Sequence, residues 1–354
     1  MEFKNLQLDD VIVLEDKKRK PLSTMYRSKR KGIYPYYGAQ EIIDSIDDYI
    51  FDGKYILLAE DGENLKSRKK DLVKIVEGKF WLNNHAHIFK VKENVDLEYL
   101  YYYLLKLDLG EYITGSTQPK LNQENMNKIK IKLPEFKIQR KISKILSNID
   151  GKIKLNNEIN NNLHELEKNL YKEYFKDLSD DNTKKLGELC NIKYGKGLPT
   201  TKIEKEGYPV YGGNGIIGYY HEFMYDNSQV LISCRGAASG NVIVSKPKSF
   251  VTNNSLILEC DRKYHYYLKQ YSLDNYYYEY TTGSAQPQIT IDNIKDIVLS
   301  IPSDELLESF NKQMENLELK YFSNLEEISK LEQLRDTLLP KLMNGEIDLE
   351  NIES

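Results

Sequence analysis

The feature that most constrains the fold is a long internal repeat. Five landmarks recur in the same order, at offsets that drift only from 174 to 168 positions. The matched ranges are 34–40 with 208–214, 57–62 with 231–236, 80–84 with 250–254, 114–119 with 282–287, and 133–134 with 301–302. A repeat of this length predicts two tandem domains built on one plan.

Each repeat is expected to end in a long helix. Apolar residues recur at spacings of three and four across 139–175 and again across 314–338, which is typical of one buried helical stripe. Asn156 and Asn157 interrupt the first stripe, and Pro340 is expected to end the second helix because proline has no amide hydrogen. Each helix would span about 36 residues, or roughly 54 Å at ~1.5 Å per residue.

The charges of the two helical segments favour their mutual packing. Residues 137–176 hold nine Lys or Arg against five Asp or Glu, whereas residues 304–354 hold five against thirteen. Neither helix can bury its apolar stripe alone, so we expect an antiparallel coiled coil whose opposite charges help to fix the pairing. The rest of the chain is nearly neutral, and the net charge is −4.

The two globular regions are expected to be α+β. Short apolar runs bounded by Gly, Asp or Asn, such as 11–14, 55–58, 230–232 and 255–258, indicate strands, and short helices are expected near 97–107 and 264–273. The predicted organisation is a first domain at 1–135, a central helix at 136–177, a second domain at 178–302, and a C-terminal helix and tail at 303–354.

Length and composition exclude several classes of protein. The 354 residues contain no apolar run near the ~18–20 residues of a membrane-spanning helix. Three scattered cysteines favour neither a disulfide framework nor a zinc cluster. The N-terminus lacks the pattern of a signal peptide, so a cytoplasmic protein is expected.

We find no catalytic, cofactor or metal constellation in the sequence. Residues 213–218 fit G-x-G-x-x-G, but no helix pattern follows, and the matching range 38–43 has lost the later glycines. Glu60, Asp61 and Glu63 near Lys66 suggest a nuclease cluster, but its second copy contains no acid, so a turn with solvated charges is favoured. His85 and His87 lack a neighbouring Cys or carboxylate in sequence that would complete a metal site.

Basic clusters and two polar loops are the candidate DNA contacts. Residues 17–31 hold eight cations and no acid, and such side chains bind phosphates through counterion release. The loops 114–119 and 282–287 carry hydroxyl and amide groups that can bond to bases or phosphates. Solvated loops and structural turns are the alternatives. The candidates are Lys17, Lys18, Arg19, Lys20, Arg27, Lys29, Arg30, Lys31, Lys66, Arg68, Lys69, Lys70, Thr114, Ser116, Gln118, Arg235, Thr282, Ser284 and Gln286.

These motifs together resemble the specificity subunits of type I restriction-modification systems. The resemblance rests on the Thr-Gly-Ser-Thr-Gln-Pro loop at 114–119, Leu-Pro at 133–134, the segment 139–150, and the C-terminal segment 334–347 with its Leu-Leu-Pro. It covers essentially the whole chain. The second half departs from the pattern at 306–311, where the Gln-Arg segment is missing.

The resemblance implies a recognition subunit without catalysis. Each domain would read one half of a bipartite and, given the divergent halves, asymmetric double-stranded DNA target. The paired helices would set the gap and dock two methyltransferase subunits, and motor-endonuclease subunits would complete the complex. S-adenosylmethionine, ATP and Mg would bind to those partners. A self-contained nuclease or methyltransferase, or a coiled-coil scaffold that does not bind DNA, are the alternatives.

Overall fold

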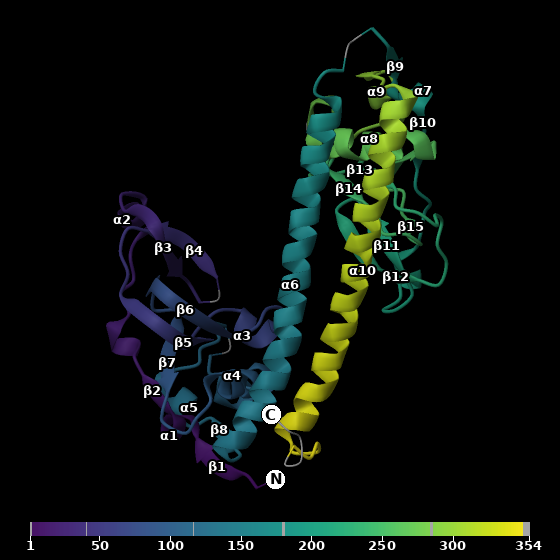
Figure 1. Ribbon diagram of the computed structural model, residues 1–354. Coiled ribbons are helices and arrows are strands. Elements are labelled where there is room, and N and C mark those ends of the chain that lie inside the picture. The colour runs from purple at the N-terminus through teal and green to yellow at the C-terminus, as the bar shows by residue number, and fades with distance from the viewer. Residues whose placement is uncertain (1, 40, 116, 179–180, 284–285, 350–354) are drawn as a thin grey trace. The chain divides into compact units, whose positions relative to one another are not determined.

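The computed structural model describes residues 2–39, 41–115, 117–178, 181–283 and 286–349 (Figure 1). The chain divides into two compact units. Unit 1 comprises Met1–Lys154 with Ser329–Ser354, and unit 2 comprises Leu155–Ile328. Each unit therefore contains one globular region and a part of each long helix.

The globular part of unit 1 is a six-stranded sheet with short helices. The strand order is β2-β7-β5-β6-β3-β4, and the pairing is antiparallel except between β3 and β6. A separate pair, β1 and β8, precedes the long helix. The elements are β1 (Lys4–Gln7), α1 (Leu8–Val11), β2 (Ile12–Leu14), η1 (Asp16–Lys18), α2 (Thr24–Ser28), β3 (Lys31–Tyr37), β4 (Ile42–Ile46), β5 (Phe51–Ala59), α3 (Asn64–Ser67), β6 (Val73–Leu82), β7 (Ala86–Val91), α4 (Leu97–Lys106), η2 (Gly110–Tyr112), α5 (Gln123–Asn127) and β8 (Lys130–Leu133).

The globular part of unit 2 repeats this plan in a shorter form. Its sheets have the orders β10-β16-β13-β14, β12-β11-β15 and β17-β9, and β11 pairs with β15 in parallel, as β3 does with β6. The elements are β9 (Thr183–Lys185), α7 (Leu186–Leu189), β10 (Cys190–Tyr194), η3 (Thr200–Lys202), β11 (Tyr208–Gly212), β12 (Gly215–Tyr220), β13 (Val230–Ser233), β14 (Val242–Val244), β15 (Phe250–Val251), β16 (Ser255–Cys260), α8 (Arg262–Asp274), η4 (Tyr278–Tyr280), α9 (Ile291–Ile294) and β17 (Val298–Ser300). The predicted α+β repeat is confirmed.

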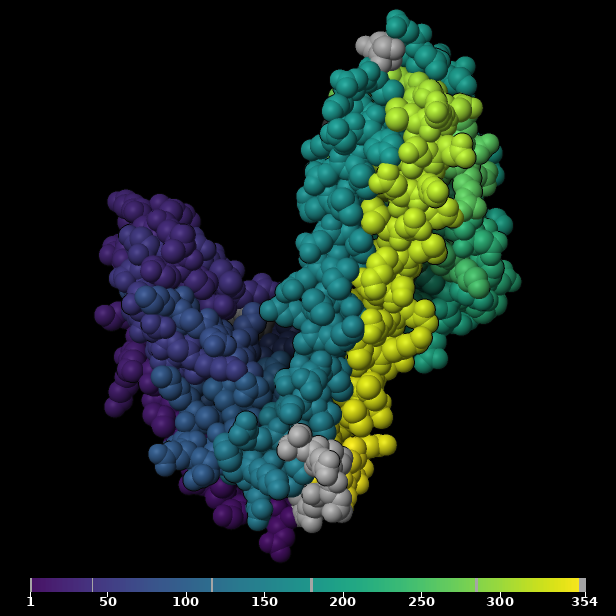
Figure 2. Space-filling view, in the orientation of Figure 1, coloured from purple at the N-terminus to yellow at the C-terminus, as the bar shows by residue number. Residues whose placement is uncertain are grey.

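The two long helices are α6 (Phe136–Phe175) and α10 (Asp304–Met343). Within each unit their segments lie side by side (Figures 1 and 2), as the coiled-coil prediction requires. In unit 1, Arg335 bonds to Asp150 at 3.0 Å, and in unit 2, Asn324 bonds to Asn160 at 2.9 Å. As the residue number rises along α6, the number of its partner in α10 falls, so the two helices are antiparallel.

The first long helix is continuous as predicted, whereas the predicted end of the second helix at Pro340 is wrong. α6 runs through Asn156 without a break, because this side chain is buried and donates to Glu327 of α10 at 2.9 Å. α10 also continues through Pro340 to Met343. Leu339 and Leu342 are buried in the unit 1 core, and this burial outweighs the cost of the proline, which is about 3 kcal/mol in a helix interior.

The end of α10 has a Schellman motif in place of the expected proline stop. Gly345 has φ of +74°. Its amide donates to the carbonyl of Leu342 at 3.3 Å, and the amide of Glu346 donates to the carbonyl of Lys341 at 2.9 Å. This arrangement satisfies the last helical carbonyls and ends the helix.

Each unit has its own apolar core against the long helices. In unit 1, α4 and the strand β5 pack with Ile138, Ile142 and Leu146 of α6. In unit 2, strand β13 and helix α8 pack with Phe175 of α6 and Phe310 of α10. The helices α4 and α8 are those predicted near 97–107 and 264–273. No helix within the described ranges is both long and apolar enough to cross a membrane.

Candidate nucleic-acid interface

Arg19, at the centre of the first basic cluster, is turned into unit 1. Its guanidinium lies 2.6 Å from the Glu60 carboxylate, 2.7 Å from the Ala86 carbonyl and 3.1 Å from the Asp16 carboxylate, and only 14% of the side chain is exposed. A guanidinium with all these partners is positioned to hold β5, β7 and η1 together. Its role as a DNA contact stays a prediction.

The other two arginines of this segment are also bound within unit 1. Arg27 donates to the carbonyl of Leu22 at 2.5 Å and pairs with Asp44 at 3.2 Å. Arg30 pairs with Asp47 at 2.8 Å. Both side chains are largely buried, which reduces the charge that this segment presents to a phosphate.

The lysines of the segment lie at the surface: Lys17, Lys18, Lys20, Lys29 and Lys31. Lys18 pairs with Glu15 at 2.8 Å and Lys31 with Asp44 at 2.6 Å. The other three have no ion pair with any residue that the structure describes. They are the members of this cluster best placed to meet DNA.

The second basic cluster surrounds α3 and is exposed throughout: Lys66, Arg68, Lys69 and Lys70. Arg68 ends the helix with φ of +50° and donates to the Leu107 carbonyl at 3.0 Å. Lys70 pairs with Glu41. The structure brings these four cations together on one short turn, as the sequence predicts.

Both polar loops are closed by a two-residue backbone ladder. The amides of Thr114 and Lys120 each donate to the other's carbonyl at 2.8 Å, and Thr282 and Gln288 repeat this at 2.8 and 2.9 Å. The two threonine hydroxyls point back to the same carbonyls, at 3.2 and 3.4 Å. The threonines therefore serve the turn itself.

The glutamines of the two loops, Gln118 and Gln286, are exposed. Their amides carry both a donor and an acceptor, so they remain candidates for a base contact. The predicted candidates Ser116 and Ser284 lie outside the described residues.

The glycine in each loop is required by the backbone. Gly115 has φ of +86°, and a Cβ there would lie 2.3 Å from the Gln118 carbonyl oxygen. We expect Gly115→Ala to lower the unfolding free energy of unit 1 by about 1–3 kcal/mol, since it adds both strain and a clash. Thermal unfolding measures this.

The matched control is Gly151→Ala in α6, where the added Cβ meets nothing within 4 Å. There the substitution is expected to be neutral or to stabilise the helix by about 0.5–1 kcal/mol. Equal melting temperatures for the two variants would contradict the assigned role of Gly115.

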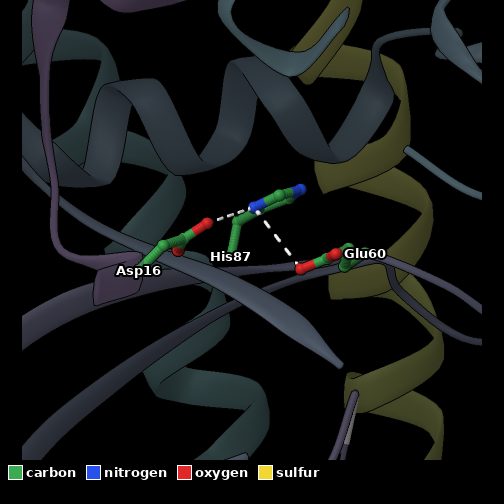
Figure 3. A group of neighbouring side chains, drawn as sticks. All are labelled: Asp16, Glu60 and His87. Atoms are coloured by element: carbon green, nitrogen blue, oxygen red, sulfur yellow. Dashed lines mark hydrogen bonds and ion pairs between the residues drawn. The ribbon is translucent and has the colours of Figure 1, made fainter. Parts of the chain in front are cut away.

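A buried charged cluster lies beside the first loop. The side chains of Asp16, Glu60 and His87 converge (Figure 3), with one ligand atom of each within 4.8 Å of the others. His87 Nδ1 is 2.6 Å from the Asp16 carboxylate, and its Nε2 is 2.7 Å from the Leu121 carbonyl just after the loop. Both ring nitrogens of His87 thus lie within hydrogen-bond distance of an oxygen.

This trio could hold a metal ion in principle, but cations of the protein are already in place. The Arg19 guanidinium bridges Asp16 and Glu60, and the Lys120 ammonium lies 3.2 Å from Glu60. The geometry is that of an ion-pair network that ties the loop to β5 and η1.

The expectation of solvated charges is wrong for Glu60, although Glu63 and Lys66 of the same turn are exposed. The Glu60 side chain is 12% exposed and has three basic neighbours, Arg19, His87 and Lys120. The next residue, Asp61, pairs with His85 at 2.9 Å. A carboxylate thus lies beside each histidine. The one beside His87 belongs to Asp16, 71 positions away in sequence, so local spacing did not indicate it.

The network makes unit 1 sensitive to acid. Burial opposes ionisation of Glu60, but Arg19, His87 and Lys120 hold the pKa of its carboxyl below the ordinary value of 4.5. A carboxyl whose pKa is lowered by folding stabilises the fold above its unfolded pKa, and the contribution is lost as pH falls through the folded pKa. We therefore expect the stability of unit 1 to decline below about pH 4.5, and Glu60→Gln to flatten that decline.

Denaturant unfolding at a series of pH values between 3 and 7 tests this. Glu93→Gln, at an exposed carboxylate, is the control and should keep the wild-type pH dependence. An unchanged acid dependence in Glu60→Gln would show that Glu60 does not supply it.

Unit 2 has a polar hollow where the network lies in unit 1. Its volume is about 740 Å³, and Arg235 and Gln286, both predicted candidates, lie on its wall. The remaining lining residues are Gly213, Asn214, Ser233, Gly236, Ala237, Ala238, Asn254, Pro287 and Gln288. Neither a carboxylate nor any other charge lines it besides Arg235, within the part of unit 2 that the structure describes.

Sequence reasoning missed Asn214, Asn254 and Gln288. The first two end repeated landmarks, 208–214 and 250–254, and this position was a signal that they could meet. The glycine motif at 213–218 is a hairpin between β11 and β12, as its lack of a following helix predicted.

Corresponding positions at this place carry different side chains in the two units. Asp61 forms a backbone bridge with Lys120, and Arg235 forms the same bridge with Gln288. The chain positions correspond, yet an acid stands in one unit and an arginine in the other.

Comparison with known proteins agrees with the repeat. A model of the type I restriction modification DNA specificity domain matches residues 1–165 and again residues 179–336. A putative type I restriction enzyme specificity subunit of Haemophilus influenzae is 34% identical over 139 residues, which is 39% of this chain and 35% of that protein.

A second relative is matched over most of its length. The MjaIX specificity subunit of Methanocaldococcus jannaschii is 24% identical over 309 residues, or 74% of this chain and 71% of the relative. The fold is similar to that of a type I restriction-modification S subunit from M. genitalium, with a TM-score of 0.69, 19% identity, and coverage of 97% and 96% of the two chains.

Proposed function

Because the chain belongs to the type I restriction modification DNA specificity family, we propose that it is the subunit that reads the DNA target of a type I restriction-modification complex. The observation that carries this proposal is the pair of family matches, one on each repeat. Two recognition domains in one chain fit a target of two half-sites.

The two half-sites are expected to differ. Framework elements recur between the units, but Asp61 and Arg235 occupy corresponding positions, and Lys120 corresponds to Gln288. Side chains of opposite charge favour different base edges, since arginine donates to guanine and a carboxylate accepts from the amino group of cytosine. The target is therefore asymmetric.

The remaining parts of the complex follow from the family. The paired helices fix the gap between half-sites and dock two methyltransferase subunits, and motor-endonuclease subunits join them. S-adenosylmethionine, ATP and Mg bind to those partners, and this chain contributes no catalytic group. The complex works in the cytoplasm, where the DNA is.

The test is salt-dependent DNA retention by the chain with and without its companion methyltransferase. The isolated chain is expected to bind weakly, because Arg19, Arg27 and Arg30 are engaged internally. The complex should retain DNA, with an affinity that falls steeply as salt rises. A complex that assembles but never retains DNA would support the scaffold alternative, and metal-dependent cleavage by the isolated chain would support the enzyme alternative.

A further inference from the structure

We propose that the hollow beside Arg235 in unit 2 receives the major-groove edge of a guanine, with the Arg235 guanidinium donating to it. This inference rests on the proposed function, and it names one base of the half-site that unit 2 reads.

Arg235 differs from the arginines of the first basic cluster because it is exposed and has no internal partner. Arg19, Arg27 and Arg30 each pair with a carboxylate. Arg235 has no hydrogen bond or ion pair from its side chain to any described residue. Its charge is therefore available to a ligand, inside a hollow whose described lining contains no acid.

The floor of the hollow has an unsatisfied hydroxyl. Ser233 is completely buried, and its Oγ has no hydrogen-bond partner among the described residues. Buried polar groups nearly always have partners, so an isolated one in a polar hollow points to a ligand or to a water that the ligand holds. A Cβ at Gly213 would come within 2.9 Å of this oxygen, so the glycine keeps the floor open.

The side chains around Arg235 match a base better than a phosphate. Asn214, Asn254, Gln286 and Gln288 each carry an amide that can both donate and accept, and none is engaged by another described side chain. A phosphate only accepts hydrogen bonds, so it could bond to the amide nitrogens of these side chains but not to their amide oxygens. A base pair presents donors and acceptors together in the major groove.

Backbone contacts fix the position of the Arg235 main chain. Arg235 lies two residues after the end of β13 and bridges to Gln288, and the amide of Gly236 donates to the Pro287 carbonyl at 3.0 Å. Bidentate recognition needs a rigidly held backbone beneath the side chain, because two parallel hydrogen bonds tolerate little error in direction. Guanine offers two adjacent acceptors, O6 and N7, that fit the planar fork of arginine.

The test is Arg235→Lys in the complex with the companion methyltransferase, read by methylation-sensitive sequencing of cellular DNA. Lysine keeps the charge but lacks the fork. We expect the variant to accept other bases at one G·C pair of one half-site, with discrimination there reduced roughly 10-fold or more. The other half-site should be unchanged and serves as the internal control.

Arg262→Lys is the matched control, since Arg262 is exposed on α8 of the same unit and pairs with Glu315 away from the hollow. It should leave every position of the motif as in the wild type. Binding of the purified complexes to double-stranded oligonucleotides with single base-pair changes covers the case in which Arg235→Lys abolishes methylation in cells.

Three results would overturn the inference. A motif unchanged in Arg235→Lys would show that Arg235 reads no base. Uniformly weaker binding to every oligonucleotide, with a smaller salt dependence, would assign Arg235 to a phosphate. A wild-type complex that assembles but methylates no motif would refute the proposed function itself, and the inference with it.

Discussion

Replacement of Arg19 by methionine is expected to destabilise unit 1 by about 3–5 kcal/mol. The substitution leaves the carboxylates of Asp16 and Glu60 buried without their principal cation. Removing one partner of a buried ion pair lowers the free energy of unfolding by far more than the intact pair contributes to it, because the remaining charge stays out of water. It also leaves the Ala86 carbonyl without its donor.

The single tryptophan provides the measurement. Trp81 is 5% exposed and belongs to unit 1, so its fluorescence in denaturant follows the unfolding of that unit. Lys18→Met is the matched control one position earlier, because this lysine is exposed and pairs with Glu15 at the surface. Little change is expected there. Equal effects for the two variants would contradict the buried network.

The second large effect is expected at Lys269 in unit 2. This lysine of α8 is 6% exposed and lies 3.2 Å from Glu167 of α6 and 3.4 Å from Glu318 of α10. It is therefore the one cation, among the described neighbours on these three helices, that contacts both carboxylates. Lys269→Met is expected to cost about 3–5 kcal/mol of unit 2 stability.

A double variant separates the charge from the packing. Glu167→Gln removes one carboxylate, so Glu167→Gln with Lys269→Met should recover part of the loss of the single methionine variant. Circular dichroism follows the unfolding, and Trp81 fluorescence should move little because it reports unit 1. A double variant no more stable than Lys269→Met would show that lost packing, and not an uncompensated charge, dominates.

The sequence predicts the large elements because their signals are local or repeated. The apolar spacing that defines α6 and α10 lies within each helix, and the repeat ties β3 to β11 and the two Gln-Pro loops to each other. The same local logic failed at Pro340, because the helix there depends on the burial of the neighbouring leucines Leu339 and Leu342 in the unit 1 core.

The candidate interface was predictable only in part. The cations around α3 are exposed, and the predicted candidates Arg235 and Gln286 share a hollow that the sequence did not predict. Arg19 looked like its lysine neighbours, because its partners Glu60 and Ala86 are 41 and 67 positions away. A run of basic residues does not reveal which of them turns inward.

In the function proposed above, each repeat reads its own half of one DNA target. Methylation-sensitive single-molecule sequencing of cells that express this chain with its companion methyltransferase tests it most directly, against cells that express the methyltransferase alone. We expect a bipartite, asymmetric motif with methylated adenine that appears only when the chain is present. A continuous motif, or no motif from a complex shown to assemble, would contradict it.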